Sequence, residues 1–253
     1  MNETTLFNAL LIGWLALAGV AFVALLFVTA PYGRHIRRGW GAAVGHRLGW
    51  MIMEAPSALV FAACFATGIY TNTATAWVFL GLWEAHYIHR AFIYPWSQRG
   101  TDKQMPIVVA FLALAVNTAN AYFNGRYLFT LSDGYPLEWM SDPRFIVGLA
   151  VFVAGYAINR QADHMLRSLR QPGESSYKIP HGGLYRWVSC PNYLGEIIEW
   201  IGWAAMTWSL PGLAFALWTI ANLAPRAQAN HRWYQEHLCG YPLERKALVP
   251  GLW

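Results

Sequence analysis

The chain has little charge for its length. Of its 253 residues, 12% are Asp, Glu, Lys or Arg, whereas about a quarter of the residues in soluble domains are charged. Hydrophobic residues make up 56% of the chain. A chain so poor in charge cannot cover a globular surface with solvated groups. The composition therefore excludes an ordinary soluble domain and favours an integral membrane protein.

Cysteine is also scarce, and the common nucleotide-binding and metal-binding motifs are missing. Cys64, Cys190 and Cys239 are odd in number and far apart, so we expect free thiols rather than a disulfide framework or a CxxC site. No GxGxxG or Walker sequence follows a strand-like segment, which excludes a Rossmann or P-loop site. His86 and His89 form one short pair without a second histidine box. No metal site is therefore predicted.

The chain does contain seven apolar runs, which we interpret as transmembrane helices. They cover residues 6–30, 49–70, 76–94, 106–123, 145–165, 192–208 and 213–223, and the last continues as a more polar helix toward residue 237. Aromatic residues reach 16%, which suits a protein with rings at both membrane interfaces. The sequence thus predicts an all-α integral membrane protein with seven transmembrane helices and one domain over residues 1–253.

The charges are distributed unevenly between the connecting segments. With the N-terminus outside, every Lys and Arg except Arg126 and Arg144 falls on the cytosolic side, whereas Asp133, Glu138 and Asp142 fall outside. Because cytosolic loops are enriched in positive charge, we predict an outside N-terminus, a cytosolic C-terminus and an active site open to the cytosol. The membrane would be a bacterial inner membrane, or the endoplasmic reticulum in a eukaryote.

A carboxyl group and a phenol are expected at similar depths in the second and third runs. Glu54 lies about one helical turn from the cytosolic end of its run, and Tyr87 lies about two turns from that end. Such a pair can hold a carbonyl group, because the phenol donates a hydrogen bond and the acid orients it. Tyr87, Arg90 and Tyr94 share a helix face, so Arg90 and Tyr94 are candidates for a substrate pocket. Alternatively, Glu54 pairs with Arg90 and Tyr87 only packs.

The fifth run ends in a polar stripe. Asn159, Asp163, Arg167 and Arg170 follow one another at spacings of three or four residues, so they share one helix face. Asp163 could bind a ribose hydroxyl, while Arg170 and Lys178 could bind phosphates. The alternative is a solvated helix end with arginines that extend toward water.

The stretch from Ile179 to Trp203 leads from a loop rich in Gly and Pro into the sixth run, which carries Glu196 and Glu199. A carboxylate inside a bilayer is costly and usually faces a partner or a water-filled cavity. A loop of backbone donors and basic residues ahead of a helix start suits an anionic ligand. We therefore predict a ligand site in this stretch.

Five segments of the chain resemble the steroid 5α-reductase family, in a bacterial form. They are EAPS at 54–57, HYIHRAFIYP at 86–95, the continuous segment 157–204, RAQANHRWY at 226–234 and YPLERKALVP at 241–250. Members of this family are seven-helix membrane enzymes that hold NADPH on the cytosolic side. The resemblance implies an NADPH-dependent oxidoreductase that reduces the Δ4 C=C bond of 3-oxo-Δ4 steroids to 5α-dihydro steroids.

The resemblance also implies roles for individual residues. Hydride would pass to C5, Tyr87 with Glu54 as its partner would stabilise the developing enolate at the C3 oxygen, and a proton would reach C4. The cofactor site would lie mainly within residues 157–250. The matching positions are Asn159, Asp163, Arg170, Tyr177, Lys178, Asn192, Glu196, Trp200, Arg226 and Tyr234. The partners would be a lipophilic steroid or enone lipid and membrane lipid, without nucleic acid or an obligatory protein partner.

Two alternatives stay open. Met53 stands where the family often has Gln, and Asn230 stands where His is frequent, so the substrate could instead be a polyprenol precursor, an enoyl thioester or another enone lipid. A different class is a membrane methyltransferase of the isoprenylcysteine type, which would use S-adenosylmethionine. Glu54 and Tyr87 on the early runs, together with the many basic residues, argue against that class.

Overall fold

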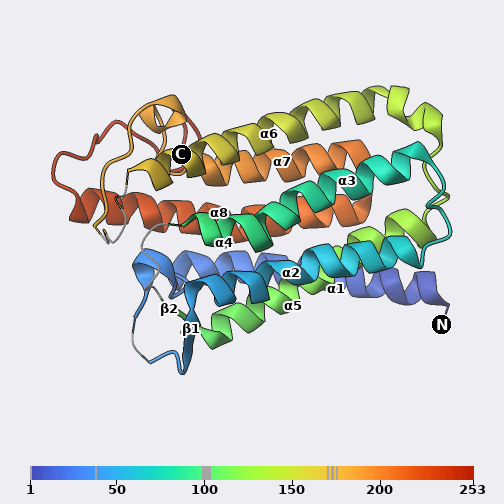
Figure 1. Cartoon of the computed structure of the whole chain (residues 1–253), viewed down its shortest axis with the longest axis horizontal. Helices are drawn as coiled ribbons and strands as arrows, with labels where there is room; N and C mark the ends of the chain where they lie inside the picture. Colours follow the sequence, from blue (N-terminus) through green and yellow to red (C-terminus); the bar gives the residue numbers. More distant parts are fainter. Residues whose placement is uncertain (1, 38, 99–103, 170, 172–173, 175) are drawn as a thin grey trace. The chain divides into compact units, whose positions relative to one another are not determined.

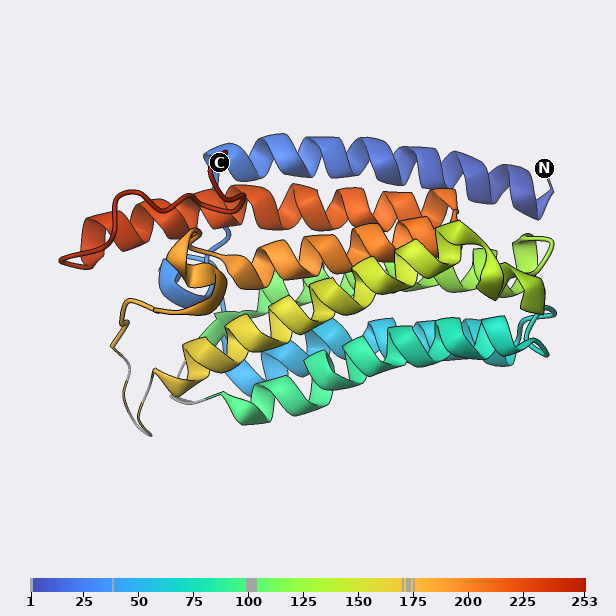
Figure 2. The ribbon, with the colours of Figure 1, turned by 90° about the horizontal axis from the view of Figure 1, so that it is seen from above.

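The computed structural model describes residues 2–37, 39–98, 104–169, 171, 174 and 176–253, and it consists mainly of helices (Figures 1 and 2). They are α1 (Glu3–Phe27), α2 (His46–Ala66), α3 (Ala74–Ile88), α4 (Tyr94–Ser97), α5 (Ile107–Arg126), α6 (Pro143–Ser168), α7 (Pro191–Thr207) and α8 (Leu210–His237). Within the described residues the strands are β1 (Ala43–Gly45) and β2 (Gln104–Pro106), which pair antiparallel. The predicted all-α class is confirmed.

Among the residues that the structure describes, four helical segments are long and apolar enough to cross a membrane. They are Glu3–Phe27, His46–Ala66, Ile107–Leu131 and Pro143–Ser168. Helix α3 has only 15 residues, fewer than the roughly 20 that a span needs, but its path continues through a π-helical segment, His89–Ile93, into α4. The chain is thus a membrane protein by composition and helix length, whereas seven spans and their orientation stay predictions.

The predicted fourth apolar run ends at residue 123, but the helix continues beyond it. Helix α5 instead runs to Arg126 and continues as a π-helical segment, Tyr127–Leu131. The reason is burial: Leu128 and Phe129 are 1% and 0% exposed, and the Phe129 ring packs edge-on against Phe61 and Phe65 at 5.2 and 5.0 Å. Aromatic packing therefore extends the helix through polar residues that resemble a turn.

The chain forms two compact units, the first made of Met1–Ile12 and Ala30–Ile146, the second of Gly13–Thr29 and Val147–Trp253. In the first unit α2, α3 and α5 lie side by side (Figure 1), and the rings of Phe61 and Trp83 stack at 4.3 Å. In the second unit α6, α7 and α8 lie side by side (Figures 1 and 2). There the Trp200 ring packs against Phe215 at 4.2 Å.

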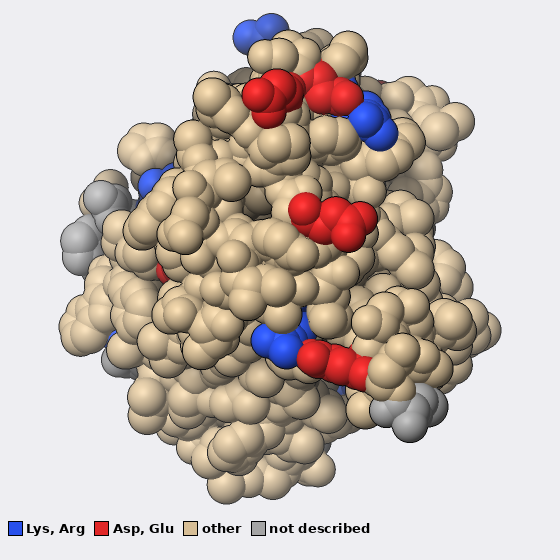
Figure 3. Space-filling view, turned by 90° about the vertical axis from the view of Figure 1, so that its right-hand side faces the viewer, with Lys and Arg blue, Asp and Glu red and all other residues tan. Residues whose placement is uncertain are grey.

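Charged side chains of the first unit pair near helix ends. Arg126 donates to Glu3 at 2.7 Å, and Arg144 donates to Asp142 at 2.8 Å. These hydrogen bonds from Arg144 lower the pKa of Asp142 to about 2. On the face shown in Figure 3, acidic and basic side chains lie in small groups on a largely uncharged surface. Such a surface agrees with the low charge content of the sequence.

Helices α6 and α7 touch backbone to backbone. A Cβ atom at Gly195 would lie 2.5 Å from the backbone nitrogen of Asn159, and one at Gly155 would collide with the backbone nitrogen of Glu199. Gly148 and Gly202 repeat this arrangement farther along the same two helices. Glycines spaced by seven residues on both helices let them approach closely, as small residues commonly do in membrane helix pairs.

We expect Gly155→Ala to lower the free energy of unfolding by about 1–3 kcal/mol, because the added methyl group forces the two backbones apart. Thermal unfolding in detergent measures the loss. The control is Gly19→Ala on α1, where a Cβ meets nothing within 4 Å and alanine favours the helix. Equal unfolding temperatures for the two variants would contradict the close contact.

Candidate functional site

A buried indole sets the register between α2 and α3 in the first unit. Trp83 Nε1 donates to the carbonyl oxygen of Ser57 at 3.1 Å. These helices contact each other and are joined by a short connection, so they run antiparallel. One turn from Ser57 toward the start of α2 is Glu54, and one turn from Trp83 toward the end of α3 is Tyr87. The bond therefore brings Glu54 and Tyr87 to the same level of the helix pair.

Glu54 is buried and is held by a residue of α5. Its exposed fraction is 9%, and its Oε2 accepts a hydrogen bond from Asn117 Nδ2 at 3.2 Å. The same amide donates to the carbonyl oxygen of Met53 at 2.6 Å. Asn117 thus fixes the Glu54 carboxyl group from one side. The sequence reasoning missed Asn117, although a polar residue inside the fourth apolar run was a signal for it.

Tyr87 is also buried, with 3% of its side chain exposed. Its ring lies 5.1 Å from the Trp83 ring and 4.9 Å from the His86 ring. These ring contacts and the burial hold the phenol in place on α3. A phenol can donate a hydrogen bond to a carbonyl oxygen.

Arg90 and Tyr94 form an aromatic cluster with Trp50 one turn farther along the pair. The Arg90 guanidinium lies 4.8 Å from the ring centres of both Trp50 and Tyr94, and these two rings are 5.1 Å apart. Cation–π contacts of this kind hold a guanidinium in place. The structure therefore brings both predicted pocket residues together on the first unit.

In the second unit, α6 and α7 share a polar network at the end where α7 begins. Asn159 Nδ2 donates to the carbonyl oxygen of Asn192 at 2.9 Å and to Glu196 Oε2 at 3.2 Å. Asn192 Nδ2 donates to Asp163 Oδ1 at 3.2 Å. Asn159 and Asp163 are each 3% exposed. The structure thus brings together four residues that the sequence predicted for the cofactor.

Trp200, Arg226 and Tyr234 lie in packed surroundings of the same unit. Trp200 is 1% exposed. The Arg226 guanidinium is 8% exposed and donates from Nε to the Tyr193 hydroxyl at 3.1 Å. The Tyr234 ring stacks on Tyr241 at 5.2 Å. Tyr193 was not among the predicted residues, and nothing in its spacing pointed to Arg226.

Two of the predicted loop residues are described. The Tyr177 ring lies 4.8 Å from the Trp233 ring of α8, so α8 supports this part of the loop. Lys178 is exposed and donates to Glu174 at 2.9 Å. Hydrogen bonds from Lys178, Ser176 and the backbone of Gln171 lower the pKa of Glu174 to about 2. Arg170, the remaining predicted residue, lies outside the described residues.

These donors and acceptors can hold a dinucleotide. Carboxylates and amides such as Asp163 and Asn192 suit ribose hydroxyls and a carboxamide, and exposed cations such as Lys178 suit phosphates. In the part of the chain that the structure describes, no group of three or more His, Cys, Asp or Glu side chains could hold a metal ion.

Long apolar helices that carry buried polar side chains define a helical membrane protein, and comparison with known proteins identifies the family. Residues 103–253 match the family model for 3-oxo-5-alpha-steroid 4-dehydrogenase. A 3-oxo-5-alpha-steroid 4-dehydrogenase 1 of Bos taurus is 40% identical, over 100% of this chain and 99% of the relative. A steroid 5-alpha-reductase DET2 of Gossypium hirsutum is 39% identical over the same shares.

A third relative, 3-oxo-5-alpha-steroid 4-dehydrogenase 2 of Sus scrofa, is 42% identical over 96% of each chain. The chain belongs to the steroid 5α-reductase family. It is accordingly an oxidoreductase of the class that acts on CH–CH groups.

We expect Asn159→Asp to lower the free energy of unfolding by about 1–3 kcal/mol, because a carboxylate would face the Asn192 carbonyl and the Glu196 carboxyl without a donor. Combining it with Glu196→Gln should restore part of this loss, since the new amide can donate to the new carboxylate. Thermal unfolding of the single and double variants in detergent measures the coupling. Strictly additive losses would contradict a direct contact between the two side chains.

Proposed function

We propose that the protein reduces the Δ4 C=C bond of 3-oxo-Δ4 steroids to 5α-dihydro steroids with NADPH. Family membership along the full chain supports this reaction class. The observation that carries the assignment is the register of α2 and α3, which brings two buried side chains, Glu54 and Tyr87, to one level. A phenol and a carboxyl group so arranged suit a ketone oxygen that gains negative charge.

In the proposed reaction, Tyr87 donates its phenolic hydrogen bond to the C3 carbonyl oxygen of the substrate. Glu54, fixed by Asn117, orients and supports the phenol. Polarising the ketone draws electrons from the C=C bond and makes C5 electrophilic. NADPH, when bound, supplies the hydride that C5 accepts. The resulting enolate at the C3 oxygen is stabilised by Tyr87 until a proton adds at C4, which completes the saturated ketone.

The proposed cofactor residues belong to the second unit, mainly within residues 157–250. Asp163, Asn192, Glu196 and Asn159 would bind the nicotinamide and ribose portions, because they form one partly buried polar network. The remaining proposed cofactor residues are Arg170, Tyr177, Lys178, Trp200, Arg226 and Tyr234. Arg170 and Lys178 carry the positive charge that the phosphates need.

We further propose that the chain works as one reductase domain with seven membrane spans, an outside N-terminus and a cytosolic C-terminus. The charge asymmetry of the loops supports this orientation. A lipophilic steroid would enter from the bilayer, and Arg90 and Tyr94 would line its pocket. Another enone or enoyl lipid remains the alternative substrate, because the Tyr87–Glu54 pair activates any conjugated carbonyl. Family membership argues against the methyltransferase class.

We expect the detergent-purified protein to oxidise NADPH only when an enone steroid such as testosterone or progesterone is present. Tyr87→Phe should lower kcat about 100-fold to 1000-fold, the usual cost of removing one oxyanion donor. Glu54→Gln should lower it less, since an amide still fills the site. Loss of NADPH fluorescence measures the turnover of each variant.

The matched control is Tyr122→Phe on α5, where the tyrosine is 40% exposed and should keep wild-type turnover. Unchanged turnover in both Tyr87→Phe and Glu54→Gln would reject the proposed carbonyl site. Tight binding of S-adenosylmethionine without any binding of NADPH would reject the reductase itself.

A further inference from the structure

A buried hydroxyl of the second unit, to which the proposed reaction assigns no role, joins three segments of the chain. Ser189 is 2% exposed. Its Oγ lies 2.6 Å from His231 Nδ1 on α8 and 2.6 Å from the Tyr241 hydroxyl. It also donates to the carbonyl oxygen of Lys246 at 3.2 Å. One small side chain thus links the segment before α7, the end of α8 and the C-terminal tail, residues 241–253.

Backbone hydrogen bonds hold the tail at the same place. Lys246 N donates to the Trp187 carbonyl at 2.8 Å, and Ser189 N donates to the Lys246 carbonyl at 2.8 Å. Cys190 N donates to the Ala247 carbonyl at 3.2 Å. The tail therefore pairs as a short parallel bridge with the residues that lead into α7.

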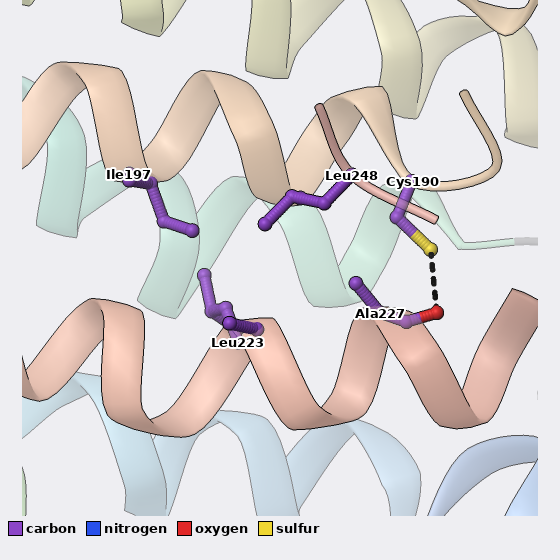
Figure 4. Close-up of a cluster of buried hydrophobic side chains, with 6 residues drawn as sticks. Cys190, Ile197, Leu223, Ala227 and Leu248 are labelled. Atoms are coloured by element: carbon purple, nitrogen blue, oxygen red, sulfur yellow. Dashed lines mark hydrogen bonds between the residues drawn. The ribbon is translucent and has the colours of Figure 1, made fainter. Parts of the chain in front are cut away.

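The tail also enters the core between α7 and α8. Figure 4 shows Leu248 beside Ile197 of α7 and Leu223 of α8. Cys190 packs in the same cluster, and its Sγ lies 3.9 Å from the Ala227 carbonyl oxygen. Losing the tail would therefore expose an apolar face at the start of α7.

The donors and acceptors of the hydroxyl cluster match one another. Gln235 Nε2 lies 3.0 Å from His231 Nε2, so the neutral imidazole accepts there and carries its proton on Nδ1. Ser189 Oγ then accepts from His231 and Tyr241 and donates to the Lys246 carbonyl, which uses the full capacity of a hydroxyl group. Burial raises the pKa of Tyr241, so the phenol stays protonated and remains a donor.

From this arrangement we propose that Ser189, His231 and Tyr241 form a clamp that positions the start of α7, and with it Asn192, for the cofactor. Ser189 directly precedes Cys190, the N-cap residue of α7, and Asn192 stands in the first helical turn. The Asn192 side-chain amide donates a hydrogen bond to Asp163, and the Asn192 backbone carbonyl accepts one from Asn159. The three clamp residues are positioning residues, and their role rests on the proposed function of this polar network.

The stability of the clamp should depend on pH because the surroundings of His231 disfavour its protonated form. The groups that face it are the Ser189 hydroxyl, the Tyr241 phenol, Gln235 and the cation Lys246. Burial, and then the charge of Lys246, lower the pKa of His231 below its usual range. The clamp is therefore intact above the ordinary histidine pKa of about 6.5 and is destabilised as the pH falls through that value toward the lower pKa of the folded protein.

Binding of NADPH to the full chain in detergent, followed by fluorescence at about pH 7.5 and about pH 5.5, tests the proposal. The dissociation constant of the wild-type protein should rise about threefold to tenfold at the lower pH. His231→Gln keeps a donor without a titrating charge, so its affinity should change little between the two pH values. Ser189→Ala should bind about threefold to tenfold more weakly at both.

The matched control is His237→Gln on the same helix, because His237 is exposed and contacts Trp233 rather than the clamp. The dissociation constant of this variant for NADPH should equal that of the wild-type protein at both pH values. Protection of the Ser189, Cys190 and Lys246 amides from hydrogen exchange, relative to their intrinsic exchange rates, gives a second reading without cofactor. This protection should be lower in Ser189→Ala than in the wild-type protein. A loss of protection on going to the lower pH should occur only in proteins that keep His231.

The outcomes separate the two proposals. If the wild-type protein binds no NADPH at either pH, the proposed function is wrong. If it binds NADPH but His231→Gln shows the same pH dependence, or Ser189→Ala changes neither affinity nor amide exchange, the clamp is wrong while the function stands.

Discussion

The close contact of α6 and α7 is the constraint on which the candidate cofactor site depends. Side-chain burial drives helices together weakly in a bilayer, since lipid is as apolar as the side chains, so packing and polar contacts decide the arrangement. Gly155 and Gly195 allow the two backbones to meet. At that separation Asn159 reaches both the Asn192 carbonyl and Glu196. With larger residues in place of the glycines, the same amide would fall short of its acceptors, and buried polar atoms would lose their partners.

In the first unit, a hydrogen bond rather than a close backbone contact brings the proposed site residues together. There an indole brings Glu54 and Tyr87 to one level, because Trp83 donates to a carbonyl of α2 while its ring stacks on Phe61. Asn117 then serves as the donor for the carboxyl group. The first unit therefore uses one buried donor to fix the register and a second side chain to satisfy the acid, whereas in the second unit glycines allow the close approach and Asn159 donates to Glu196. The residues proposed for the carbonyl and for the cofactor thus rest on independent interactions.

The sequence predicted the helices well, because an apolar run is a property of a single segment. It failed where partners decide the structure. Residues 127–131 are helical because Phe129 meets rings of α2, which no local pattern reveals. Asn117, Tyr193 and Ser189 went unnoticed for the same reason: their roles depend on which helix faces them.

The proposed chemistry also explains why this chain keeps buried polar side chains at all. Each buried amide or carboxyl group costs free energy unless it is hydrogen-bonded, and a fold that needed only stability would replace Asn159, Asp163 and Glu54 with apolar residues. Their partners, Asn117, Asn192 and Glu196, are partly buried polar groups, so hydrogen bonds offset this cost. Satisfied networks of this kind are rigid, and rigidity is what a hydride acceptor and a polarised ketone require of their surroundings. The burial of these residues thus lowers the stability of the fold and also makes them suitable for the proposed reaction.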